Sequence, residues 1–457
     1  MDNVPARTGP MVASGVGTSS SCEDFIMLNR RKFVGVGAAA GAAGYFVNPV
    51  ASAASKSPNE RLNLACVGAT NRAGANIAAL KSQNIVAIAD IDANLLEKGA
   101  APYEGVRKYR DFRVMLEKES EKIDAVVVGT PDHTHAPAAA MAMRMGKHCY
   151  CEKPLTHTVK EARVLAELAI KNKLKTQMGT QIHSLDNYRR VVEAVQGGMI
   201  GTVREAHVWS NAQYTGARLE PAEKPRNVDW DLWLGPAAER EYCKNVHPFN
   251  WRRYWDYGAG ALGDFGCHYM DLTHWALKLR HPTRVSARGN PLDKVTPPSW
   301  CIVDYDFPAR GEMPPVRLTW YDGGKRPPQL AELKDGQGKP LNWSSGQLFI
   351  GEKGMILSNY GQHVLLPVDK FADARRPEQW IPKSVGHHRE WVEAIRDDKT
   401  TTCNFDYSGA LTECVLLGVA SFRSQQPIEW DAKNLKVKND EGAQAFIHKE
   451  YRKGWTL

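Results

Sequence analysis

The stretch Gly129–Pro154, GTPDHTHAPAAAMAMRMGKHCYCEKP, decides the fold that we expect for this chain. The run that leads into it, 124–129 (DAVVVG), is apolar, rich in Val and too short for a helix, which is typical of a parallel strand covered on both faces. A polar turn with His133 and His135 follows, then an Ala/Met-rich helix and a short strand. Open α/β sheets bind ligands at the carboxyl ends of their strands. Lys153, which leaves the short strand just before a proline, is therefore the first candidate for chemistry.

Length and composition set the class of protein. With 457 residues the chain is long enough for two domains or three, and its 43% hydrophobic and 24% charged residues are ordinary for a soluble globular protein. The net charge of +8 is modest, and no Lys/Arg run is interleaved with aromatic residues. We therefore expect no nucleic-acid partner, and no membrane span in the mature form.

The first 53 residues carry the features of an export signal. Arg30 and Arg31 precede an Ala/Gly-rich apolar segment, 34–50, and the small residues 51–53 suit a cleavage site. Paired arginines before a mildly hydrophobic segment indicate the twin-arginine route. We predict a periplasmic or otherwise exported protein whose partner is the twin-arginine machinery, with a low-complexity start and translation from Met27.

A nucleotide-binding turn is expected near residue 68. The apolar strand 62–67 runs into a Gly-containing turn and then a helix, an arrangement that directs backbone N–H groups at a phosphate. Relative to the G-x-G-x-x-G pattern only Gly68 is kept, since Thr70 takes the second glycine position and Ala73 the third. An acid about 20 residues further on, Asp90, is placed to bind the adenosine ribose and to repel a 2′-phosphate. The expected cofactor is therefore NAD, with NADP possible. The predicted contacts here are Gly68, Thr70, Asn71, Arg72 and Asp90.

The order of strands and helices predicts an α/β protein of two unlike domains. Strands alternate with helices over 62–183, which indicates an N-terminal Rossmann domain with a doubly wound parallel sheet. From 184 to 385 strand-like runs follow one another with few helices, which indicates an α+β substrate-binding domain with a large, mostly antiparallel sheet. We expect the helices and tail of 386–457 to pack back near the first domain. An exposed face of the second sheet would suit a homo-oligomer, either a dimer or a tetramer.

A second group of polar residues lies between residues 245 and 272. Asp264, His268 and Asp271 recur at helical spacing and share one face, so an acid and an imidazole one turn apart suit proton transfer; a surface stripe is the alternative. Just upstream, Trp251 and Arg252 belong to a dense aromatic and guanidinium cluster that suits a sugar, although buried Trp packing explains it equally well.

His183 follows the last strand of the first sheet and is a candidate for reaching the same cleft. A helix-cap or core role is the alternative. Cys149 and Cys151 lie two residues apart near several histidines, but this spacing does not match a zinc knuckle. We read them as buried strand cysteines and predict no metal.

These motifs together resemble the Gfo/Idh/MocA oxidoreductases, especially their exported bacterial members. The resemblance extends over about residues 62–440 and rests on GTPDHTH, CEKP, HPFNW and GALGDFGCHYMD, while the glycine turn departs from the usual pattern. It implies that Lys153 is the catalytic lysine and that Asp264 and His268 are the catalytic Asp and His. It further implies a nicotinamide side formed by Thr130, Pro131, His133, His135 and Glu152.

The expected reaction is reversible NAD(P)-dependent oxidation of a sugar or polyol hydroxyl by a tightly held cofactor. In it His268 removes the hydroxyl proton, Lys153 polarises or protonates the oxygen, and Asp264 positions one of the two. Two alternatives remain: a redox-neutral glycoside hydrolase or lyase that oxidises its substrate transiently, and a sugar-binding protein with a relic nucleotide fold.

Overall fold

The computed structural model describes residues 61–457. The expected export signal and cleavage site lie outside the described residues. Among the helices of the described part, none is both long enough and apolar enough to cross a membrane.

The first sheet is parallel and has the strand order β3-β2-β1-β4-β5-β6. Its strands are β1 (Asn63–Val67), β2 (Asn84–Ala89), β3 (Arg107–Tyr109), β4 (Ala125–Val128), β5 (His148–Cys151) and β6 (Thr176–Met178). The order reverses between β1 and β4, which is where a doubly wound sheet forms its ligand crevice. The predicted Rossmann sheet is confirmed, and β3 is a short strand that the sequence pattern did not reveal.

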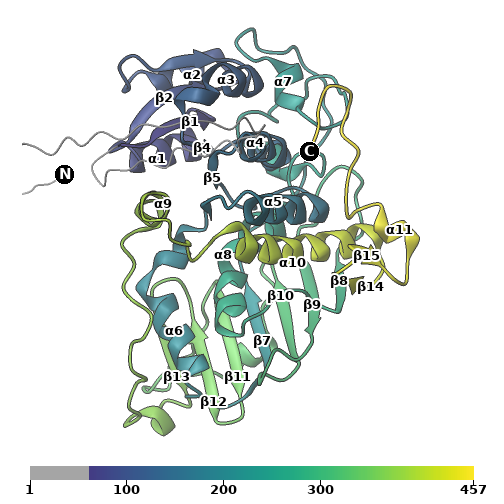
Figure 1. Cartoon of the computed structure of the whole chain (residues 1–457). Coiled ribbons are helices and arrows are strands. Elements are labelled where there is room, and N and C mark those ends of the chain that lie inside the picture. Colours follow the sequence, from purple (N-terminus) through teal and green to yellow (C-terminus); the bar gives the residue numbers. More distant parts are fainter. Residues whose placement is uncertain (1–60) are drawn as a thin grey trace, which may run out of the picture. The chain divides into compact units, whose positions relative to one another are not determined.

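Helices cover both faces of this sheet (Figure 1). They are α1 (Asn71–Ala79), α2 (Ala93–Ala100), α3 (Phe112–Glu119), α4 (Asp132–Arg144) and α5 (Val159–Lys171). On one face α1 and α2 pack with α9 (His387–Arg396), whose Trp391 is fully buried against this core. The other face packs against α3, α4 and α5. A helix from the end of the chain thus completes the hydrophobic core on this face of the first sheet.

The helix α4 begins earlier than the sequence predicted. His133 and His135 lie in its first turn rather than in a loop before it. Both imidazoles are buried and reach backbone carbonyls of other segments, those of Trp233 and Pro154 respectively. Tertiary partners therefore satisfy side chains that would otherwise favour an exposed turn.

The second sheet has nine strands in the order β13-β12-β11-β7-β10-β9-β8-β14-β15. All its neighbouring pairs are antiparallel except β7 with β10. Its strands are β7 (Val203–Trp209), β8 (Arg284–Gly289), β9 (Cys301–Phe307), β10 (Val316–Tyr321), β11 (Gly346–Gly351), β12 (Gly354–Ser358), β13 (His363–Leu366), β14 (Ile428–Asp431) and β15 (Lys436–Val437). The end of the chain thus extends the second sheet through β14 and β15, in addition to packing near the first domain.

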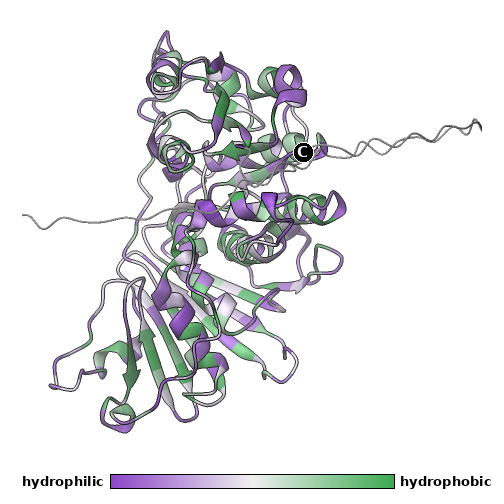
Figure 2. Ribbon diagram, turned by 60° about the vertical axis from the view of Figure 1, so that its left-hand side comes forward, coloured by the Kyte–Doolittle hydropathy of each residue, from purple (hydrophilic) through white to green (hydrophobic). Residues whose placement is uncertain are grey.

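Three longer helices line the inner face of this sheet: α6 (Asp186–Gln196), α8 (Gly260–Ala276) and α10 (Phe405–Ser424). In Figure 1, α10 lies between α5 and the second sheet, and it contacts both. Two short helices, α7 (Trp230–Leu234) and α11 (Glu441–Gln444), belong to the connections. Hydrophobic residues run along the strands of both sheets (Figure 2), and the cysteines of the described part are all buried and unpaired.

Candidate functional site

A cavity of about 370 Å³ opens at the carboxyl ends of the first sheet's strands. Its walls come from the turns after β1, β2, β4 and β5 on one side and from the second domain on the other. Among the predicted site residues, the cavity is lined by Gly68, Thr70, Asn71, Arg72, Asp90, Thr130, Pro131, His135, Glu152, Lys153, Trp251, Arg252 and His268.

Two glycines, one directly after β1 and one directly after β4, shape the turn after β1. Gly68 has φ +96°, a conformation that L side chains rarely adopt, and an added Cβ would lie 2.9 Å from the Cβ of Ala73. Gly129, after β4, is equally constrained, because its added Cβ would lie 2.8 Å from the same methyl group. The third glycine of the usual pattern permits close packing of helix and strand. Here Gly129 supplies that space, which explains how Ala73 is accommodated.

Asp90 lies at the end of β2, where the sequence placed it. Its two carboxylate oxygens accept hydrogen bonds from the backbone N–H groups of Ala69 and Asp92, both at 3.0 Å. Burial raises the pKa of this carboxyl above its ordinary value, and the two backbone donors oppose that rise. The carboxylate is thus fixed beside the glycine turn, at the edge of the cavity.

Glu152 is a buried acceptor for several donors at once. Its Oε1 accepts from Arg72 Nε at 2.9 Å, from Asn76 Nδ2 at 2.9 Å and from Gln181 Nε2 at 3.0 Å. A Cβ on Gly179 would lie 2.4 Å from this carboxylate, so the glycine makes room for it. Arg72 is therefore held by a carboxylate of the first domain.

The fit of a dinucleotide can be tested on these residues. The hydroxyl of Thr130 lines the cavity region, is buried, and has no hydrogen-bond partner among the described residues. Hydrogen-bond donors and acceptors that suit a nucleotide lie together here. They are the glycine turn at the start of α1, the fixed carboxylate of Asp90 after β2 and the unpartnered hydroxyl of Thr130 after β4. His135 closes this side by spanning the carbonyls of Thr130 (2.7 Å from Nε2) and Pro154 (2.8 Å from Nδ1).

The two chemical motifs of the sequence meet in space. Lys153 Nζ donates to the carboxylate Oδ1 of Asp264 and to its backbone carbonyl, each at 2.7 Å. Arg252 Nε reaches the same Oδ1 at 3.3 Å, and its guanidinium lies over the ring of Trp251. Burial would raise the pKa of the Asp264 carboxyl, but the charges of Lys153 and Arg252 outweigh burial and hold that pKa below its usual range. Asp264 is thus an ionised group behind the lysine rather than part of the cavity wall.

His268 lies one helical turn after Asp264 on α8 and lines the cavity. Burial lowers the pKa of its imidazole well below the ordinary value, and the charge of Lys153 lowers it further. Its Nδ1 is buried with no hydrogen-bond partner in the described part of the chain. The imidazole is therefore neutral at pH 7, which is the form that accepts a proton.

Besides Asp264, two predicted site residues lie outside the cavity wall. His133 is fully buried; its Nε2 is 2.9 Å from the Trp233 carbonyl, and its ring packs on Trp233 and Tyr257. His183 is also buried, stacks on Trp275 with ring centroids 4.1 Å apart, and places Nδ1 2.9 Å from the Asp271 carboxylate. Neither residue reaches the cavity, because each has found partners inside the protein.

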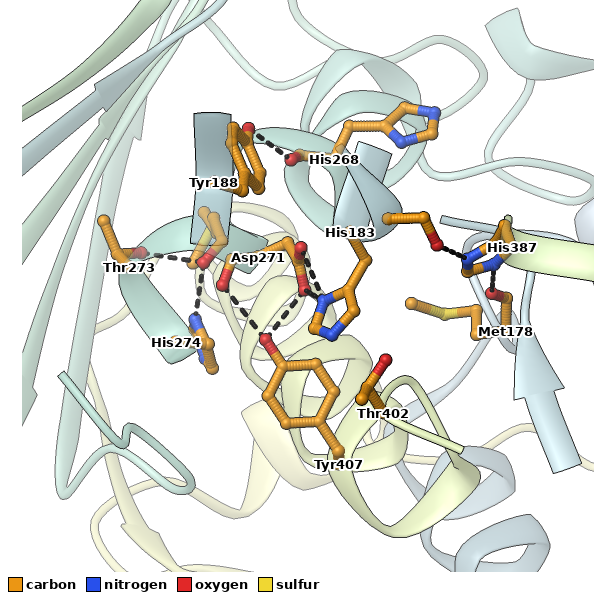
Figure 3. A network of polar contacts seen from close by, with 12 residues as sticks. Met178, His183, Tyr188, His268, Asp271, Thr273, His274, His387, Thr402 and Tyr407 are labelled. Atoms are coloured by element: carbon orange, nitrogen blue, oxygen red, sulfur yellow. Dashed lines mark hydrogen bonds and ion pairs between the residues drawn. The ribbon is translucent and has the colours of Figure 1, made fainter. Parts of the chain in front are cut away.

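Figure 3 shows the network around His183. Tyr407 donates to Asp271 Oδ1 at 2.7 Å. Asp271 lies on α8, the helix that carries His268, but it does not line the cavity. Cys403 completes a group with His183 and Asp271 whose ligand-type atoms lie within 4.8 Å of one another, the arrangement nearest to a metal-binding one that the described residues contain. His183 and Asp271 already bond each other, so we interpret this group as a hydrogen-bonded network in the protein core.

Several residues at the site were missed from the sequence. Asp132 lines the cavity and is buried; burial and then the charge of Asp264 raise the pKa of its carboxyl well above the ordinary value. His247 and Phe249 come from the HPFNW motif, and Trp233 comes from α7. The quoted motifs contained Asp132 and His247, but nothing in the sequence indicated that α7 lies across the mouth of the first domain's strands.

The first sheet is a Rossmann sheet, and Lys153 lies at its strand ends together with Asp264 and the neutral His268 of the second domain. This arrangement is typical of two-domain, nucleotide-binding α/β proteins. Two family profiles match the chain: "Oxidoreductase family, NAD-binding Rossmann fold" over residues 41–180 and "Oxidoreductase family, C-terminal alpha/beta domain" over residues 190–309. Together they cover more than half of the sequence. The chain belongs to the Gfo/Idh/MocA oxidoreductase family.

Curated relatives are similar over part of their length. An inositol 2-dehydrogenase of Rubrobacter xylanophilus is 30% identical over 169 residues, which are 36% of this chain and 46% of that protein. A levoglucosan dehydrogenase of Pseudarthrobacter phenanthrenivorans is 27% identical over 194 residues, 41% of each chain. The chain thus aligns with about half the length of the curated relatives that it matches.

Solved structures share the fold over their whole length. The WlbA dehydrogenase of Bordetella pertussis, in complex with NADH and UDP-GlcNAcA, superposes with a TM-score of 0.56 at 18% identity, covering 81% of this chain and 99% of that one. GenD2 from gentamicin A biosynthesis, in complex with NAD, gives 0.56 at 19% identity, covering 84% and 100%. At these identities the comparison establishes the fold alone.

Proposed function

We propose that the protein is an NAD-dependent oxidoreductase that transfers hydride between a sugar or polyol hydroxyl carbon and the nicotinamide ring. The observation that carries the proposal is the contact of Lys153 with Asp264 beside a neutral His268, at the strand ends of a sheet whose turns suit a dinucleotide. The family membership and the dehydrogenase relatives support it.

The bound cofactor supplies hydride chemistry at its nicotinamide ring. The chain's residues manage the proton. His268, neutral and without a side-chain partner in the described part, is placed to take the proton of the hydroxyl group. Lys153, a donor fixed by Asp264, is placed to hold the hydroxyl oxygen and to stabilise the negative charge that develops on it. Asp264 orients Lys153 through the hydrogen bond from Nζ to its carboxylate.

The fixed carboxylate of Asp90 supports NAD over NADP, since a second negative charge on the ribose would lie beside it. The aromatic and guanidinium surface of Trp251, Arg252 and Phe249 supports a polyhydroxy substrate, because flat rings and fixed donors suit the faces and hydroxyls of a sugar.

The test is a substrate panel with purified protein and NAD. We expect myo-inositol, levoglucosan or a related polyol to produce the absorbance of reduced nicotinamide in proportion to turnover. Release of an aglycone from a glycoside without net reduction would instead establish the redox-neutral hydrolase or lyase. No nucleotide binding by calorimetry would reject both.

We propose further that the chain is exported by the twin-arginine route and forms a dimer or tetramer. Export by the twin-arginine route is supported by Arg30 and Arg31 before the apolar segment 34–50. A dimer or tetramer is supported by the outer face of the second sheet, which carries ion pairs such as Arg288–Asp304. Changing both N-terminal arginines to lysine should retain the protein in the cytoplasm, and light scattering on the purified protein should give a mass above one chain. Unchanged export, or a monomer, would reject the respective proposal.

A further inference from the structure

A second cleft of about 460 Å³ lies away from the nucleotide cavity. It is bordered by the end of α10, by the chain that follows α11 and by the residues just before α5 and α8 (Figure 1). We call it the α10–tail cleft. The residues that the argument uses are His157, Trp255, Arg423, Phe446 and Lys449.

Arg423 is the first unusual feature of the α10–tail cleft. Its guanidinium lies 4.7 Å from the ring centroid of Phe446 and 5.2 Å from that of Trp255, but it makes no hydrogen bond or ion pair with any described residue. Burial lowers the pKa of this arginine below its ordinary value, and the charge of Asp256, which also lines the cleft, opposes that. Asp256 itself bonds Arg240, at 2.6 Å. A guanidinium has five donors, and partly buried ones usually have acceptors.

Lys449 is the second cation of the cleft. His157 Nε2 faces the carbonyl of Gly258 at 3.3 Å, so it carries the proton, and the opposite nitrogen accepts from Lys449 Nζ at 2.9 Å. The nearest acid, Glu161, is 3.9 Å from Nζ and already accepts from the hydroxyl of Tyr451 at 2.6 Å. At least one ammonium N–H of Lys449 is therefore without a strong acceptor.

The two cations repel each other across the cleft. Burial lowers the pKa of Lys449, and the charge of Arg423 lowers it further, against the opposing effect of the acids. Asp256 and Glu450 also line the cleft, but Asp256 is bonded by Arg240, and neither acid forms an ion pair with Arg423 or Lys449 in the described part of the chain. The N–H groups of the Arg423 guanidinium therefore stay available to a ligand in the cleft.

We propose that the α10–tail cleft binds a small anion with a carboxylate or phosphate group, held by the guanidinium of Arg423 and the ammonium of Lys449. The rings of Trp255 and Phe446 fix the orientation of Arg423 and give the non-polar part of such a ligand a surface to pack on. This site is separate from the nucleotide cavity and does not depend on the proposed oxidoreductase activity.

The test is calorimetric titration of the full-length protein with inorganic phosphate and, separately, with benzoate, in a buffer free of other anions that bind arginine. Binding of phosphate alone identifies a phosphate ligand, and binding of benzoate identifies a carboxylate ligand with an apolar part. We expect Arg423→Met and Lys449→Met to weaken the binding by about tenfold or more, since each removes a charge-assisted hydrogen bond. Arg423→Lys keeps the charge and should retain part of the affinity.

Two control variants locate the ligand. Arg288→Met removes an arginine from the outer sheet face and should leave the affinity unchanged. Arg72→Met alters the nucleotide cavity and should also leave it unchanged. Loss of binding in Arg72→Met with normal binding in Arg423→Met and Lys449→Met would place the anion in the nucleotide cavity and overturn the proposal. Failure of both probes to bind the wild-type protein would overturn it as well.

Discussion

Replacing Lys153 by Met removes the ammonium group at the centre of the site while keeping a side chain of similar length. Lys153 Nζ lies 2.7 Å from Asp264 Oδ1, and its side chain is only 12% exposed. The change therefore removes the proposed donor to the reacting oxygen together with the partner of a buried carboxylate.

The structure sets the size of the expected effects. A positioned acid–base group contributes about 10²–10⁴-fold to a rate, so kcat should fall by about that factor while NAD binding is kept. Arg252, 3.3 Å from Asp264, still compensates the carboxylate, so the loss of unfolding free energy should be about 1–3 kcal/mol rather than that of an isolated buried charge. The charge of Lys153 also lowers the pKa of His268, so that pKa should rise in the variant.

The assay combines steady-state reduction of NAD over a pH series with calorimetric NAD affinity and denaturant unfolding. Lys175→Met is the matched control, because Lys175 Nζ also lies 2.7 Å from an aspartate and its side chain is 17% exposed. We expect the control to retain wild-type kcat. Full activity in Lys153→Met would refute the assigned role, and equal losses in both variants would show that the effect is one of stability alone.

Three other outcomes are expected. Burial lowers the pKa of His133 to about 3, against about 6.5 in the unfolded chain. The neutral imidazole therefore contributes stability that is present above pH 6.5 and is lost by about 1.4 kcal/mol per pH unit as the pH falls toward 3. His133→Phe should remove about one proton from the acid dependence of denaturant unfolding, and an unchanged slope would contradict this. Asp90→Asn should raise the NADP to NAD ratio of kcat/KM by about tenfold or more by removing the charge beside the 2′ position, and an unaltered ratio would show that Asp90 does not face the ribose. Gly129→Ala would place a Cβ 2.8 Å from the Cβ of Ala73, so it should lower the free energy of unfolding by about 1–3 kcal/mol and weaken NAD binding. Gly361→Ala, whose added Cβ would meet nothing within 4 Å, serves as the control.

Much of the fold followed from local patterns. The apolar runs 62–67 and 124–129 predicted two strands of a parallel sheet, because a strand buried on both faces needs a continuous apolar sequence. The structure pairs these two strands with each other. Two inner strands of the second sheet were missed: β8 has a single buried residue and little apolar signal, and β12 is a five-residue strand that pairs with β11 directly after a short turn. The return of β14 and β15 to the second sheet was missed for a similar reason: a pairing with strands more than 100 residues away leaves no local mark.

The sequence by itself determined the chemistry that this protein has available: a lysine ahead of a proline, an acid and an imidazole one helical turn apart, and an acid after the second strand. These follow from the spacing of residues within single elements, which is fixed by helix and strand geometry. Only the tertiary structure decided which side chains meet. It brought Lys153 to Asp264 across two domains and gave His133 and His183 buried partners. Among the described residues it gave Arg423 no ion-pair partner. Contacts of this kind depend on how distant segments pack and on which groups burial removes from water, and no local spacing records either.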